Sequence, residues 1–155
     1  RTVKVNLGAG LSVADGWLNV DSSPSAFFAR WPTPVLRLIY SVSGARDEYP
    51  VDEYIRILKT HWFICHNLQY GIPVPAGTVD YLYASHLLEH LSRSDAETLL
   101  VDAHRVLKDG GRFRIAVPDL ELVMGLYAGG KKGIALAEVF GDAGAYHGHK
   151  YMYDL

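Results

Sequence analysis

The stretch VKVNLGAGLSVADGWLNVD, residues 3–21, decides the fold. Apolar and polar residues alternate over 3–7, which predicts a β-strand, and Gly8-Ala9-Gly10 follows as a tight turn. A second short strand is predicted over 17–21, and it ends on the carboxylate of Asp21. The stretch therefore predicts two neighbouring strands, with glycines at the end of one and an acid at the end of the other.

Strand and helix patterns alternate along the rest of the chain. β-branched and aromatic residues predict further strands over 63–68, 79–85 and 113–117. Helices are predicted over 25–40 (broken by prolines), 52–59, 119–128 and 131–140. Another is predicted from a capping box of Ser94 with Glu97 to a stop at Gly110 and Gly111. The alternation predicts an α/β fold over 1–155, a doubly wound, mostly parallel sheet with helices on both faces.

Composition restricts the classes of function. The 155 residues include 15 Lys or Arg and 17 Asp or Glu, so the basic excess of nucleic-acid-binding proteins is absent. No run of about 18 apolar residues could span a bilayer. Cys65 is the only cysteine, which favours a reducing compartment. We therefore expect a cytoplasmic protein, monomeric or homodimeric, without nucleic-acid or membrane partners.

The glycine turn and Asp21 predict a nucleoside site. Ligands bind beyond the carboxyl ends of parallel strands, glycine lets the backbone approach them, and a carboxylate can accept both hydroxyls of a ribose. The dinucleotide fingerprint requires a third glycine and an acid about 20 residues further on, and neither follows Gly8 and Gly10. We therefore expect a nucleoside that lacks phosphates. The structural alternative is that the glycines only form a turn and Asp21 only caps one.

Short motifs follow one another in a particular order: VNLGAG, GWLNVD, PVP, VD, SHLLEHL, RVLKDGG and VPD, within residues 5–119. This order resembles class I S-adenosylmethionine-dependent methyltransferases of the type-11-like group. The resemblance implies a Rossmann-like methyltransferase fold, with the cofactor S-adenosylmethionine, the product S-adenosylhomocysteine and a small-molecule methyl acceptor. The closing strand pair of that fold is not visible here, so we expect a single domain that is truncated at its C-terminus.

The resemblance also implies the site residues. The cofactor-binding residues would be Leu7, Gly8, Ala9, Gly10, Asp21, Ser22, His66, Asn67, Leu68, Ser85 and His86. Asp21 would hold the ribose, and Asn67 would present its amide oxygen to the adenine amine where the family often has an aspartate. Methyl transfer is an in-line displacement that depends on alignment. His86 and His147 are the candidate catalytic residues, because an imidazole can take a proton from the acceptor near neutral pH.

Two other functions remain open. Asn67 and the absent closing elements are also compatible with a domain that binds the cofactor without transferring methyl groups. The segment HLLEH, residues 86–90, matches the H-x-x-E-H motif of zinc hydrolases, in which His86 and His90 would bind zinc on a helix. The methyltransferase order explains these residues without a metal. We therefore expect no metal site, and we expect Glu89 and His90 to hold the turn by hydrogen bonds to backbone.

Aromatic residues can form the walls of a dry pocket around a sulfonium. Those outside the predicted strands are the better candidates: Tyr40, Tyr49, Tyr54, Trp62 and Tyr127. Tyr81 and Tyr83 lie in the strand over 79–85, so we expect them in the core.

Overall fold

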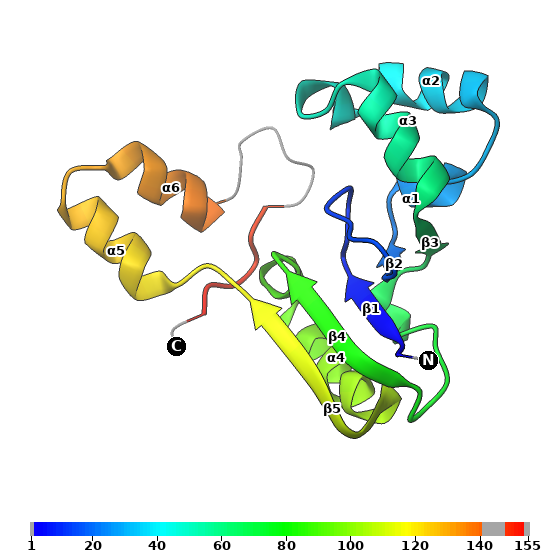
Figure 1. The fold of residues 1–155 in the computed structure, drawn as a ribbon. Coiled ribbons are helices and arrows are strands. Elements are labelled where there is room, and N and C mark those ends of the chain that lie inside the picture. Colours follow the sequence, from blue (N-terminus) through cyan, green and yellow to red (C-terminus); the bar gives the residue numbers. More distant parts are fainter. Residues whose placement is uncertain (1, 141–147, 154–155) are drawn as a thin grey trace.

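The described part of the chain, residues 2–140 and 148–153 of a computed structural model, is built around a parallel sheet (Figure 1). The strand order is β3-β2-β1-β4-β5, and every neighbouring pair is parallel. The strands are β1 Lys4–Leu7, β2 Leu18–Asp21, β3 Trp62–Cys65, β4 Val79–Ser85 and β5 Leu107–Ala116. The order in which strands are added to the sheet reverses between β1 and β4, so the carboxyl ends of these two strands form the switch point of a doubly wound sheet. The predicted doubly wound, parallel α/β fold is confirmed, but the prediction that helices cover both faces is not met among the described residues, because α5 and α6 extend away from the sheet.

Helices pack against one face of this sheet and beside its β3 edge. The helix α4 (Arg93–Val106) buries Leu99 and Ala103 against Val5 and Leu82 in the main core. A second cluster, around Leu36, Tyr54 and Leu58, joins the helices α2 (Thr33–Val42) and α3 (Val51–Thr60), and the helix α1 (Pro24–Phe28) contacts β3. The helices α5 (Leu120–Ala128) and α6 (Lys132–Phe140) pack on each other and extend away from the sheet (Figure 1). None of the described helices is long and apolar enough to cross a bilayer.

The boundaries of α4 differ from the prediction. The helix is capped by Ser92, not Ser94: the Ser92 hydroxyl accepts a hydrogen bond from the Asp95 N–H (3.1 Å) and donates one to the Asp95 carboxylate (2.7 Å). The helix ends at Val106 because Leu107 already pairs with β4. Gly110 therefore lies inside β5 instead of ending the helix. β3 is also shorter than predicted, because the chain turns into the 3-10 helix η2 (Leu68–Tyr70).

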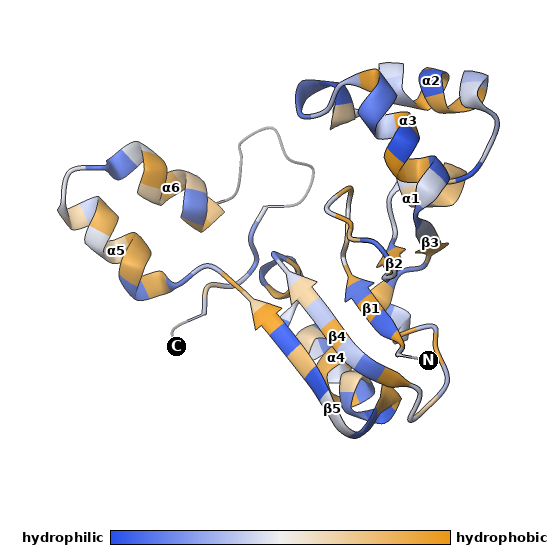
Figure 2. Cartoon of the chain, viewed as in Figure 1, coloured by the Kyte–Doolittle hydropathy of each residue, from blue (hydrophilic) through white to orange (hydrophobic). Residues whose placement is uncertain are grey.

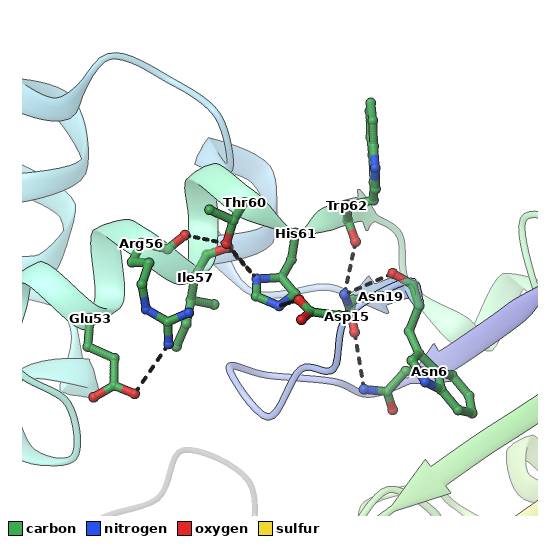
Figure 3. Close-up of polar contacts among 10 residues, drawn as sticks. Asn6, Asp15, Asn19, Glu53, Arg56, Ile57, Thr60, His61 and Trp62 are labelled. Atoms are coloured by element: carbon green, nitrogen blue, oxygen red, sulfur yellow. Dashed lines mark hydrogen bonds and ion pairs between the residues drawn. The ribbon is translucent and has the colours of Figure 1, made fainter.

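The connection between β1 and β2 contains no helix, as the close spacing of Gly8 and Asp21 predicts. A buried pair of carboxamides holds this connection on the sheet (Figure 3). Asn6 Nδ2 donates to Asn19 Oδ1 (3.2 Å) and to the Ser12 carbonyl (3.0 Å), and Asn19 Nδ2 donates to the carbonyl of Trp62 on β3 (3.0 Å). These hydrogen bonds hold the β1–β2 connection in place, as a packed crossover helix does in other parallel sheets. Because this connection contains no helix, it offers no helix N-terminus to bind a pyrophosphate.

The face of β1, β4 and β5 opposite α4 is polar. Along β5, polar and apolar residues alternate (Figure 2), which directs Phe113 into the main core and Arg112 and Arg114 to the opposite side. A cavity of about 700 Å³ on that side is lined by both arginines and by Tyr81 and Tyr83. Tyr81 is 42% exposed, so the prediction that these tyrosines belong to the core is wrong. The β-branched and aromatic residues of a segment predict a strand, but they do not show which face of that strand is covered.

A carboxylate on α4 fixes the loop that precedes β4. Asp102 Oδ2 accepts the Ile72 N–H (2.5 Å), and Arg105 both pairs with Asp102 and donates to the Ile72 carbonyl (3.0 Å). The hydrogen bond from the Arg105 guanidinium lowers the pKa of Asp102, burial opposes this, and the Ile72 N–H lowers the pKa further.

Asp102→Ala is expected to lower the free energy of unfolding by about 1.5–3 kcal/mol near neutral pH, the value of hydrogen bonds to a charged group. Since the folded-state pKa is depressed, the contribution is complete above the unfolded value of about 3.9 and is lost as the pH falls through the folded pKa. Denaturant titrations of wild type and variant should therefore converge in acid. The control Asp52→Ala, in an exposed pair with Arg37, should change stability by less than about 0.5 kcal/mol. A difference for Asp102→Ala that stays constant into acid would contradict this account.

Candidate functional site

A cavity of about 630 Å³ lies at the carboxyl ends of β1 and β4. Its walls are the Gly8–Gly10 turn after β1, Ser85 at the end of β4, His86 after it, and residues between Ser43 and Tyr49. The volume falls within the range of small-molecule sites, and the switch point is where such sheets bind ligands. The structure thus brings together Gly8, Ala9, Gly10, Ser85 and His86 from the predicted site.

The two glycines of the turn have different reasons to be glycine. Both have a left-handed φ, +62° at Gly8 and +51° at Gly10, which only glycine adopts without strain. A Cβ on Gly8 would lie 2.8 Å from Leu87 Cδ1, so the turn and the segment after β4 are in close contact there. A Cβ on Gly10 would meet nothing within 4 Å, so Gly10 faces open space.

Alanine substitutions should separate these two effects. Gly10→Ala should cost about 1–2 kcal/mol for the left-handed conformation alone. Gly8→Ala should cost about 1–3 kcal/mol more, because Leu87 has to shift. Denaturant unfolding of the two variants gives this difference directly. Equal losses would show that the Gly8–Leu87 contact is unimportant.

Asp21 is tied to the glycine turn by its side chain. Its Oδ2 accepts the Gly10 N–H (2.8 Å) and its Oδ1 accepts the Ser23 N–H (2.7 Å). A carboxylate has about four lone-pair positions, so about two remain for further donors. The carboxylate is half-buried next to the turn, although it is not among the residues that line the cavity. Asp21 therefore fits a ligand diol.

The remaining predicted cofactor residues fall outside the cavity wall. Ser22 is exposed, whereas Leu7 and Leu68 are buried in the main core. The His66 N–H donates to the Asp21 carbonyl (3.0 Å), which places the segment after β3 beside β2. Asn67 is exposed, and its Oδ1 accepts the Gln69 N–H (3.0 Å), so only one of its acceptor positions is used. His147, the other predicted catalytic residue, lies outside the described residues.

His86 is held in an unusual conformation at the end of β4. Its φ is +50°, a left-handed value that costs a non-glycine residue about 1 kcal/mol or more, and its N–H donates to the Ala116 carbonyl (3.0 Å). The imidazole is 65% exposed, and its Nδ1 lies 3.1 Å from Oε1 of the fully buried Glu89. With Nδ1–H donating to Glu89, the Nε2 lone pair is free to accept a proton.

The segment after His86 also differs from the zinc-hydrolase arrangement. Leu88–His90 forms the single 3-10 turn η3, so His86 and His90 are not one turn apart on an α-helix. The Glu89 side chain contacts the His86 imidazole, whereas the sequence predicts contacts with backbone. Spacing alone could not distinguish these arrangements, because it does not fix the type of helix.

The C-terminal segment lies against this same turn. The carbonyl of Glu89 accepts the N–H groups of Lys150 (2.6 Å) and Tyr151 (3.3 Å), and the Tyr153 hydroxyl donates to the Leu88 carbonyl (3.4 Å). Burial raises the pKa of Tyr153, and the charges of Glu89 and Tyr151 add to the shift. The end of the described chain is therefore packed beside the site.

The charge of the cavity limits its ligand. Among the described residues, Glu48 and His86 are the only Asp, Glu, His, Lys or Arg residues in its wall, so this part of the chain offers no Lys or Arg for a phosphate. The part of the wall between Ser43 and Tyr49 was not predicted to bind the cofactor. Within it, the sequence predicted only that Tyr49, as an aromatic residue, could form a wall of the pocket. The cavity therefore suits a neutral or cationic ligand.

Residues 41–115 match a family model described as a methyltransferase domain. This segment, just under half of the chain, is therefore similar to methyltransferase domains. The matched segment includes His66, Asn67, Ser85 and His86 but begins after the glycine turn and Asp21, whose roles rest on the geometry above. The family implies S-adenosylmethionine as the cofactor.

Solved structures also resemble the chain at low sequence identity. They include the mitomycin 7-O-methyltransferase MmcR (14% identity, TM-score 0.47, 74% of this chain and 30% of that chain). Another is a SAM-dependent methyltransferase from Aquifex aeolicus (15%, 0.43, 74% and 55%), and a third is the YcgJ protein from Bacillus subtilis (16%, 0.43, 74% and 43%). The chain thus spans between 30% and 55% of the length of these proteins. No curated protein matches the chain, and the methyl acceptor is not identified.

Proposed function

We propose that the cavity at the ends of β1 and β4 binds S-adenosylmethionine and that the protein transfers the methyl group of this cofactor to a small-molecule acceptor. One observation carries this proposal: the Gly8–Gly10 turn is hydrogen-bonded to Asp21 and lies in the same cavity wall as His86. Glycines for close approach, a carboxylate for a diol and a histidine for a proton are the groups that this chemistry needs.

The residues fit the cofactor by charge and by hydrogen-bonding capacity. The free lone pairs of Asp21 would accept the two ribose hydroxyls. Gly8 and Gly10 would lie beside the methionine part, and His66 and Asn67 would lie near the adenine. When bound, S-adenosylmethionine supplies a methyl group on a positively charged sulfonium, and the absence of Lys and Arg from the described wall is compatible with that charge.

His86 would hold the proton that the acceptor loses. The buried Glu89 carboxylate holds Nδ1–H and so keeps Nε2 as the proton acceptor, which makes Glu89 a positioning residue. Tyr49 and Tyr83 line the same cavity and would exclude water around the acceptor. We further propose a cytoplasmic enzyme, monomeric or homodimeric, and the lone Cys65 supports the reducing compartment.

The proposal is tested by calorimetry with S-adenosylhomocysteine, followed by transfer of labelled methyl groups to a panel of hydroxyl and amine acceptors. Binding with turnover on any acceptor supports the methyltransferase. Binding without turnover across the panel would favour the alternative of a cofactor-binding domain. The absence of binding by a folded, full-length protein would overturn both.

A further inference from the structure

Three potential metal ligands meet where the C-terminal segment packs on the turn after β4. Glu89, His90 and His149 each offer one ligand atom, and these atoms lie within 4.8 Å of one another. The imidazole rings of His90 and His149 meet edge to face, with 4.9 Å between their centroids. The group differs from the H-x-x-E-H arrangement, since it includes His149 and leaves out His86.

Each of the three side chains has a lone pair that nothing uses within the described residues. Glu89 is 0% exposed, and its Oε2 has no hydrogen-bond partner although its Oε1 contacts His86. His90 Nδ1 is likewise buried without a partner. His149 Nδ1 lies 2.6 Å from the Glu138 carbonyl, so its N–H donates there and Nε2 keeps a lone pair. Buried polar atoms rarely stay unpaired, which indicates that a ligand belongs here.

We propose that Glu89, His90 and His149 bind one divalent transition-metal ion, of which zinc is the test case. One carboxylate and two imidazoles form a known zinc ligand set that leaves a fourth position for water. A divalent cation would also neutralise a carboxylate that has no Lys or Arg partner among the described salt bridges.

The surroundings of the three side chains support this site. Metal-binding histidines usually donate their second ring N–H to a carbonyl, and metal-binding carboxylates usually accept a further hydrogen bond. The His149–Glu138 and Glu89–His86 contacts are of these two kinds. Ligand atoms around tetrahedral zinc lie about 3.4 Å apart, so the three ligand atoms, which lie within 4.8 Å of one another, would move closer together when the ion binds. The ion would fasten the C-terminal segment to the turn that holds His86.

Zinc binding to the full chain, measured by competition with a chromophoric chelator, tests the site. Wild type should bind one equivalent, and His149→Gln and His90→Gln should each weaken binding by at least about 100-fold, more than loss of a supporting contact. The matched control His104→Gln changes an exposed histidine on α4 and should bind as wild type does. Co²⁺ bound to wild type should show the visible absorption of tetrahedral coordination, and His149→Gln should lose it.

His149 lies outside the two buried core clusters, so His149→Gln should keep the fold. Circular dichroism and unfolding that match those of wild type would confirm this. Equal zinc affinity in wild type and a folded His149→Gln would overturn the site, and so would a wild type that binds neither zinc nor Co²⁺. Water bridging Glu89 and His90 would then be the remaining explanation. S-adenosylhomocysteine binding in the same samples reports separately on the proposed methyltransferase.

Discussion

Asp21→Ala is expected to weaken the binding of S-adenosylhomocysteine by about 100-fold or more, because two hydrogen bonds from the ribose to a charged group are worth about 3 kcal/mol or more. The same substitution removes the acceptors of the Gly10 and Ser23 N–H groups and so loosens the glycine turn. Calorimetry on the full chain measures the change, and thermal unfolding shows whether the variant is folded.

Two further variants separate the effect on the ligand from the effect on the turn. Asp21→Asn keeps an oxygen acceptor but loses the charge, so we expect a smaller loss of about 10-fold. Asp15→Ala removes an exposed carboxylate in the same connection and should leave the affinity unchanged. If folded Asp21→Ala binds as tightly as wild type, the ribose does not lie at the end of β2.

The second large effect is expected at His86. His86→Gln should lower kcat for methyl transfer by about 10²–10⁴-fold, the usual contribution of a positioned general base, with a much smaller loss of cofactor affinity. Single-turnover methyl transfer, on whichever acceptor the panel identifies, separates this from slow product release. The matched variant His104→Gln, far from the strand ends on α4, should keep the wild-type rate. An unchanged rate in His86→Gln would assign the proton transfer elsewhere.

Most of the sheet was predictable because alternation of polar and apolar residues marks a strand independently of its neighbours. The alternation over residues 3–7 identified β1, and the apolar run over 79–85 identified β4. The first residue of α4 could not be predicted, because Ser92 and Ser94 are equally good N-caps in isolation and only the surrounding turn selects one of them. β5 runs through Gly110, a residue that usually ends an element, because pairing with β4 begins at Leu107 and resumes at Arg112 after a shift in register.

The candidate site was predictable where it lies at strand ends. Gly8, Gly10, Ser85 and His86 come together because parallel strands bring their carboxyl ends to one edge of the sheet. The wall from Ser43 to Tyr49 was not predictable as part of the site, since its position depends on how α2 and α3 pack. The pairing of Glu89 with His86 depends on a single turn of 3-10 helix, which spacing does not specify.

The buried carboxamides of Asn6 and Asn19 also align the short strands β1 and β2. β1 and β2 have four residues each, so apolar contacts alone discriminate weakly between neighbouring alignments. If β2 slid by one residue along β1, Asn19 would turn into the apolar layer under α4 and Val20 would face the carboxamide of Asn6. Burying an amide without a partner costs about 1–3 kcal/mol. The pair thus fixes the register of β2 against β1, and so keeps Asp21 at the end of β2 beside the end of β1.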